Sequence, residues 1–135
     1  MTSDLPAYCE WAENPTSEPV AYSVIIPAYN EAIRILPTVA AIAVHISSLG
    51  KSWELIVADD GSTDNTVELL DGLNLANLHV LRAKTNGGKG SAVRRGVLAA
   101  RGEVILFADA DQSTSIEHFG DLLVEIDRGN DVAIG

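Results

Sequence analysis

The sequence has little cysteine, little positive charge and no long apolar run. Its single cysteine, Cys9, excludes a disulfide within the chain and is compatible with a reducing compartment. Nine Lys and Arg face nineteen Asp and Glu among 135 residues, and the net charge of −10 argues against non-specific binding to nucleic acid or anionic lipid. No apolar run approaches the roughly 18 residues of a membrane span, and the N-terminus lacks the basic start and apolar core of a secretory signal. We therefore expect a soluble segment in the cytoplasm or, in a full-length protein, at the cytoplasmic face of a membrane.

Two common nucleotide-binding motifs are also missing. A dinucleotide fingerprint needs G-x-G-x-x-G directly after the first strand, but the apolar run at 22–27 is followed by Ala-Tyr-Asn-Glu. The glycine-rich turn at 87–91 has glycine rather than Ser or Thr after Lys89, and it lacks the spaced upstream glycine of a phosphate loop. These absences argue against a nicotinamide cofactor and against a P-loop ATPase.

The chain divides into two parts of different composition. Residues 1–19 hold four acidic residues, three prolines and no cation, so we expect an acidic N-terminal extension that is flexible or loosely docked. Residues 20–135 are enough for one domain, and a hydrophobic content of 47% supplies one buried core.

The apolar pattern of residues 20–135 alternates between short β-branched runs and helical spacing. It predicts strands at 22–27, 53–58, 78–81, 103–108 and 131–134 and helices at 37–49, 66–73, 88–100 and 116–128. Asn65 and Glu68 resemble a capping box at the start of the second helix. The stripe that the first helix should bury consists of Val39, Ala40, Ala43, Ile46 and Ser47.

The alternation of strands and helices predicts an α/β fold. Its sheet should be mostly parallel, with helices on both faces and right-handed crossovers. Because the fifth strand has hardly begun at Gly135, we interpret the chain as truncated after that strand.

Three turns rich in carboxylates or glycine follow predicted strands, at 59–62, 86–91 and 109–112. Ligands of open α/β sheets bind outside the carboxyl ends of the strands, so these turns should converge on one site. Six of the nine cations fall between residues 82 and 101, around the glycine turn. The alternative for three of them, Arg94, Arg95 and Arg101, is a solvated helix face. Acidic pairs beside a basic glycine turn suggest a metal-bridged phosphate ligand.

Four segments in this order resemble the nucleotide-binding half of family 2 glycosyltransferases with the GT-A fold. They are SVIIPAYNE at 23–31, DDGSTD at 59–64, NGGKGSAVRRG at 86–96 and DAD at 109–111. The resemblance covers residues 20–135 and looks closest to the polyprenyl-phosphate branch, which includes the dolichyl-phosphate β-glucosyltransferases. It implies an inverting transfer of a hexose from a nucleoside-diphosphate sugar to an acceptor such as polyprenyl or dolichyl phosphate. UDP is favoured as the nucleotide, with GDP as the alternative. A general base, where one is needed, would lie outside this segment, so we expect the chain to bind donor but to transfer sugar poorly.

The resemblance also implies roles for the acidic residues at the strand ends. Asp111 is expected to bind Mg²⁺ or Mn²⁺ directly, and Asp109 to contact the ribose or, through water, the metal. Asp60 is expected to accept a hydrogen bond from the base edge, while Asp59 braces its own turn. The alternative for Asp109 or Asp111 is a cap of the next helix.

The remaining residues implied by the resemblance contact the nucleoside and the phosphates. Pro27, Ala28 and Tyr29 are expected around the base and Glu31 near the nucleoside, although Tyr29 could instead pack at the sheet edge. Lys89 is expected to contact the nucleotide or its phosphate, together with the N–H groups that begin the following helix.

Two other classes of function stay open. A sugar-phosphate nucleotidylyltransferase also uses an α/β nucleotide domain with a metal, but the glycine-rich signature after the first strand is missing. A non-catalytic nucleotide-binding or assembly domain is the other alternative for a chain of this length.

Overall fold

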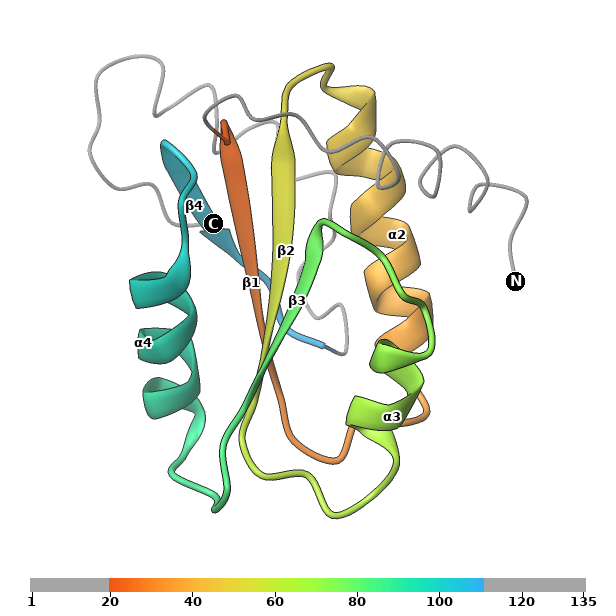
Figure 1. The fold of residues 1–135 in the computed structure, drawn as a ribbon, viewed down its shortest axis with the longest axis vertical. Helices are drawn as coiled ribbons and strands as arrows, with labels where there is room; N and C mark the ends of the chain where they lie inside the picture. The colour runs from red at the N-terminus through yellow and green to blue at the C-terminus, as the bar shows by residue number, and fades with distance from the viewer. Residues whose placement is uncertain (1–19, 111–135) are drawn as a thin grey trace.

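The computed structural model describes residues 20–110, which form a parallel sheet with helices on both faces (Figure 1). This arrangement confirms the predicted α/β class. The predicted extension at 1–19, helix at 116–128, strand at 131–134 and metal ligand Asp111 lie outside the described residues. In chain order the elements are β1 (Tyr22–Ala28), α2 (Ile35–Ser48), β2 (Trp53–Asp59), α3 (Thr66–Asp71), β3 (Leu78–Arg82), α4 (Lys89–Ala99) and β4 (Val104–Phe107).

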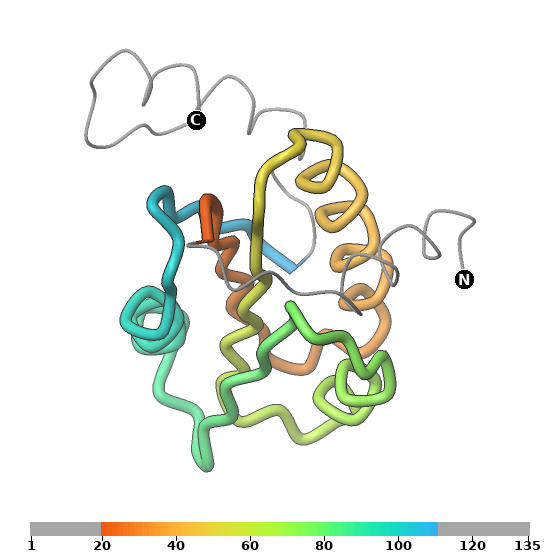
Figure 2. The backbone as a smooth tube through the Cα atoms, turned by 45° about the horizontal axis from the view of Figure 1, so that its top comes forward, coloured from red at the N-terminus to blue at the C-terminus, as the bar shows by residue number. Residues whose placement is uncertain are grey.

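The strand order reverses next to β1. The described sheet has the order β3-β2-β1-β4, and each strand runs parallel to its neighbours. The chain therefore moves outward from β1 to β3 and then returns past β1 to β4. Figures 1 and 2 show α2 and α3 on one face of the sheet and α4 on the other, as right-handed crossovers in opposite directions require. The crevice between the carboxyl ends of β1 and β4 is the place where such sheets bind ligands.

The core lies mainly between the sheet and α2. Residues of β2 are buried along the whole strand, as expected for a parallel strand covered on both faces. The stripe that α2 buries differs from the prediction, because the helix begins at Ile35 and not at Pro37. The 3.6-residue repeat from Ile35 places Ile42 on the buried face. Ala40 and Ser47, which were predicted to be buried, are half-buried. The buried residues of α2 are Ile35, Thr38, Val39, Ile42, Ala43 and Ile46.

On the other face, α4 approaches β1 through a glycine. A Cβ atom on Gly96 would lie 2.4 Å from Cγ2 of Ile25, a distance that no side chain tolerates. Gly96 therefore lets the helix backbone lie close to the sheet, and this contact sets the height of α4 above β1.

The predicted capping box at the start of α3 is wrong. Asn65 makes no side-chain hydrogen bond to the helix. Asp64 takes this role instead, since its Oδ1 accepts the Thr66 N–H at 3.0 Å while its Oδ2 accepts the Ala32 N–H at 3.2 Å. The hydrogen bond from the Thr66 hydroxyl, with smaller contributions from these N–H groups, holds the pKa of Asp64 below its ordinary value. Asp64, rather than Asn65, therefore caps the helix, and it also holds the loop that follows β1 through the N–H of Ala32.

Candidate functional site

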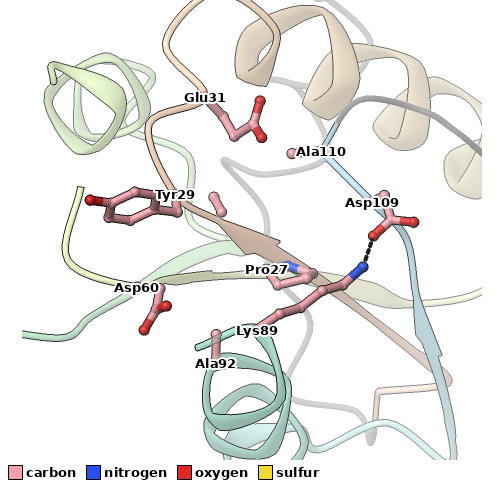
Figure 3. A pocket seen from close by; sticks show the side chains of 9 residues that line it. Pro27, Tyr29, Glu31, Asp60, Lys89, Ala92, Asp109 and Ala110 are labelled. Atoms are coloured by element: carbon pink, nitrogen blue, oxygen red, sulfur yellow. Dashed lines mark hydrogen bonds and ion pairs between the residues drawn. The ribbon is translucent and has the colours of Figure 1, made fainter. Parts of the chain in front are cut away.

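A cavity of about 240 Å³ lies at the carboxyl edge of the sheet, where the strand order reverses (Figure 3). All seven residues that the sequence predicted for nucleotide-sugar binding line it, although they come from four separate segments. The sequence prediction did not include Ala92 and Ala110, which complete the wall. The lining residues are Pro27, Ala28, Tyr29, Glu31, Asp60, Lys89, Ala92, Asp109 and Ala110. Their role in binding stays a prediction, but their convergence is a property of the fold.

Asp59 and Asp60 are adjacent in sequence and act on different parts of the structure. Successive residues of an extended strand point to opposite faces of the sheet. Oδ2 of Asp59 accepts N–H groups of its own turn, from Gly61 at 3.2 Å and Ser62 at 3.0 Å, which agrees with the bracing role predicted for it. Asp60 lines the cavity, and its carboxylate accepts the N–H groups of Gly87 and Gly88, both at 2.8 Å.

The glycine turn leads directly into α4. Gly88 has φ of 98°, a backbone conformation that residues with a side chain rarely adopt, and it occupies the N-cap position without a capping side chain. The first turn of α4 contains no acidic residue. The first N–H groups of a helix have no partner within the helix and carry partial positive charge, so this end of α4 favours an anion.

Lys89 and Asp109 meet at the cavity. Nζ of Lys89 forms a hydrogen-bonded ion pair with Oδ1 of Asp109, and Figure 3 shows the lysine extending from the start of α4 toward the segment after β4. The Lys89 side chain is 66% exposed and that of Asp109 36%, so both remain accessible to a ligand. The segment after β4 is anchored by Thr38 of α2, whose buried hydroxyl donates to the Ala110 carbonyl at 2.5 Å.

The loop after β1 is fixed by a residue that the sequence analysis did not single out. Asn30 has φ of 53°, and its Oδ1 accepts the N–H of Thr63 at 2.8 Å, which joins this loop to the one after β2. Asn is a residue type that tolerates positive φ, and its place two residues after the end of β1 was the indication that the sequence offered. Within the same loop, Glu31 is paired with Arg34 at 2.7 Å, and Tyr29 is 42% exposed rather than packed at the sheet edge.

The positive charges that cluster in the sequence separate in the structure. Arg101 contacts the buried carboxylate of Glu54, near the opposite edge of the sheet from the cavity. Arg95 is turned toward the end of β2, where its Nη2 donates to the Asp59 carbonyl at 3.3 Å. The alternative of a solvated helix face is therefore wrong for Arg95, whose side chain is 31% exposed. Arg101 follows the end of α4, and its side chain remains 67% exposed. Among the described cations, Lys89 alone lines the cavity.

The described donor atoms are compatible with a metal that ligand phosphates help to hold. Residues 20–110 contain no group of three or more side chains that could hold a metal ion by themselves. Mg²⁺ is commonly bound by one or two carboxylates together with substrate phosphate oxygens and water, so the accessible carboxylate of Asp109 fits such an ion. Within the same residues, no helix has the length and apolar character needed to cross a membrane.

Comparison with solved structures places the fold among known glycosyltransferases. The chain resembles S. aureus TarS 1–349 in complex with UDP-GlcNAc, with a TM-score of 0.62 and 30% identity over 81% of this chain and 32% of the other. It also resembles the mannosyltransferase PcManGT of Pyrobaculum calidifontis in complex with GDP-Man and Mn²⁺, with a TM-score of 0.58 and 26% identity over 80% of this chain and 35% of the other. These similarities confirm the predicted GT-A fold.

Sequence comparison defines the family. A dolichyl-phosphate beta-glucosyltransferase of Dictyostelium discoideum is 39% identical over 125 residues, which cover 83% of this chain and 38% of that protein. The Saccharomyces cerevisiae enzyme of the same name is 37% identical over 124 residues, covering 86% and 37%. The chain thus spans less than two fifths of the length of these relatives. Residues 23–135 match the family described as glycosyl transferase family 2, and the chain belongs to that family.

Proposed function

We propose that this chain is the donor-binding part of an inverting glycosyltransferase, which moves a hexose from a nucleoside-diphosphate sugar to a polyprenyl or dolichyl phosphate. The observation that carries the proposal is the convergence of Asp60, Lys89 and Asp109 on one cavity at the reversal of strand order. The names of the two curated relatives support the lipid-phosphate acceptor. Such an enzyme would work at the cytoplasmic face of a membrane.

In this proposal the diphosphate lies between the start of α4 and Asp109. Departure of the nucleoside diphosphate concentrates negative charge on the leaving phosphate, and preorganised positive groups stabilise that charge. Lys89 and the N–H groups at the start of α4 supply them. Asp109, together with Asp111, would hold Mg²⁺ or Mn²⁺, and the metal would supply further stabilisation of the leaving phosphate.

The nucleoside lies toward the loop after β1. The exposed ring of Tyr29 offers a stacking face for the base, and Glu31 lies close enough to the cavity to accept from a sugar hydroxyl. We favour UDP over GDP as the nucleotide. The bound ligands of the two structural neighbours, UDP-GlcNAc and GDP-Man, make both nucleotides worth testing.

We expect the 135-residue chain to bind donor better than it transfers sugar. The cavity of about 240 Å³ is smaller than the roughly 300–1,000 Å³ of typical small-molecule sites, which supports a site that further residues complete. A lipid phosphate is already an anion and needs less help from a general base than a hydroxyl acceptor does.

The test is calorimetric titration of UDP and then GDP into the chain, with Mn²⁺ or with EDTA. We expect metal-dependent binding that Asp109→Asn and Asp111→Ala weaken. Asp71→Asn, which removes the same charge from the exposed end of α3, serves as the control and should leave binding unchanged. A folded chain that binds neither nucleotide would favour the assembly-domain alternative, and pyrophosphate exchange with a sugar phosphate would favour a nucleotidylyltransferase.

A further inference from the structure

Asp60 is directed at the glycine turn rather than at open solvent. Its side chain is 6% exposed, Oδ1 accepts the Gly87 N–H and Oδ2 accepts the Gly88 N–H. We propose that Asp60 is a positioning residue: it fixes the turn that presents Lys89 and the start of α4, and thereby governs affinity for the diphosphate more than the choice of base. This inference rests on the proposed function, because it names which part of the donor depends on Asp60.

The two hydrogen bonds are of the strong kind. An ionised carboxylate that accepts two backbone N–H groups forms charge-assisted bonds, which are shorter and stronger than neutral ones. Both bonds here measure 2.8 Å, and they join the end of β2 to a turn 27 and 28 residues further along the chain. Gly87 and Gly88 immediately precede Lys89, so the position of the turn sets where α4 begins.

Arg95 contacts the same strand end about two helical turns after Gly88. Its Nη2 lies 3.9 Å from Oδ1 of Asp60 and donates to the Asp59 carbonyl. Asp60 therefore contacts the turn before α4 and lies beside a cation within α4. Two contacts at different points along a helix restrain its rotation as well as its translation, and this restraint directs Lys89 toward Asp109.

The substitution Asp60→Asn separates this role from recognition of the base. An amide has one oxygen that accepts and one NH₂ group that donates, so it can satisfy Gly87 or Gly88 but would oppose the other N–H. The turn should loosen while the volume of the side chain is kept. A matched control is Asp71→Asn, which makes the same chemical change at an exposed site.

The first experiment measures amide hydrogen exchange by NMR in the ligand-free chain. Asp60→Asn should speed exchange by roughly tenfold or more at whichever of Gly87 and Gly88 faces the new NH₂ group, as loss of a charge-assisted hydrogen bond implies. The change should be smaller if that residue is Gly88, because Asn86 Oδ1 also accepts its N–H at 3.1 Å. Gly72, whose N–H is bonded to the Glu68 carbonyl, should change less than twofold. Unchanged exchange at Gly87 and Gly88 would overturn the proposal. If the variant does not fold, the wild-type chain decides, because unprotected amides at these two glycines would contradict the contacts.

The second experiment compares a ligand that has a base with one that lacks it. The affinities for UDP and for pyrophosphate, each with Mn²⁺, should fall by the same factor in Asp60→Asn, roughly tenfold. Weakened UDP binding with unchanged pyrophosphate binding would mean that Asp60 reads the base, and this would overturn the inference. If the wild-type chain binds neither ligand, the proposed function fails, and the exchange measurement still decides whether Asp60 positions the turn.

Discussion

Lys89 and Asp109 form an ion pair that closes the space between α4 and β4. The two residues are 20 positions apart in sequence, and each follows a different strand of the sheet. The ion pair therefore places an ammonium and a carboxylate side by side at the cavity. In the proposed function a diphosphate would contact Lys89 and its metal would contact Asp109.

The substitution Lys89→Met should weaken the binding of the nucleotide without weakening the binding of the metal. Loss of a hydrogen bond to a charged group costs about 1.5–3 kcal/mol, so affinity for UDP with Mn²⁺ should fall at least tenfold. Binding of Mn²⁺ alone, measured by electron paramagnetic resonance of the free ion, should become no weaker, because the substitution removes a cation that competes for Asp109. Lys51→Met, an exposed lysine before β2, is the matched control. Unchanged UDP affinity in Lys89→Met would remove Lys89 from the site.

Thr38→Val should destabilise the protein although the side chain keeps its shape. The substitution leaves the Ala110 carbonyl without the hydroxyl that donates to it in a buried position. An unsatisfied buried acceptor costs about 1–3 kcal/mol, which urea unfolding would measure. The hydroxyl of Ser48 donates within an exposed helix end, so Ser48→Ala should change the unfolding free energy by no more than about 0.5 kcal/mol. Equal effects of the two variants would contradict a special role for Thr38.

Glu54 makes the stability of the chain depend on pH. Burial alone would raise the pKa of Glu54, but hydrogen bonds from Ser23 and Arg101 together outweigh it and hold the pKa below its ordinary value of 4.5. The unfolded state thus binds the proton more readily, so the contribution is complete above pH 4.5 and is lost as the pH falls through the folded-state pKa.

Glu54→Gln is the test of this dependence. The variant should lose about 1–3 kcal/mol at neutral pH, because its NH₂ group would replace Oε1, which accepts the Arg101 Nε–H at 3.2 Å. The bonds that Oε2 accepts, from the Ser23 hydroxyl at 2.6 Å and the Arg101 N–H at 2.7 Å, would also lose their charge assistance. Below pH 4.5 its unfolding free energy should fall less steeply than that of the wild type. Parallel pH profiles from urea unfolding would show that Glu54 does not carry the effect.

Substitution by alanine should lower the free energy of unfolding at one glycine of α4 and not at another. Gly96→Ala would place a methyl group against Ile25 and force α4 away from the sheet, at a cost of about 1–3 kcal/mol. Gly90 has open space around it, so Gly90→Ala should be neutral or stabilising by up to about 1 kcal/mol through helix propensity. A neutral Gly96→Ala in thermal unfolding would argue against the close approach of helix and sheet.

The strands and the convergence of polar residues could be predicted from the sequence. Short apolar runs located β1 to β4 within one residue at each end, because runs of this length between turn residues are typical of strands in a parallel sheet. The positions of Asp60, Lys89 and Asp109 after three of these strands followed directly, since parallel strands end at the same edge. The helix ends were harder, because Asp64 and Asn65 are both good caps and a contact to Ala32 decides between them.

By itself, the sequence determined the order of elements and the edge of the sheet to which the polar turns are delivered. These follow from the alternation of strands and helices and from parallel topology, in which all strands end at the same edge. Only the tertiary structure decided the partners: Asp60 with the glycine turn, Lys89 with Asp109, and Arg101 with Glu54 rather than with the cavity. Those choices depend on distances between elements that are far apart in the chain, and Coulomb attraction and hydrogen bonding act only once packing has set these distances.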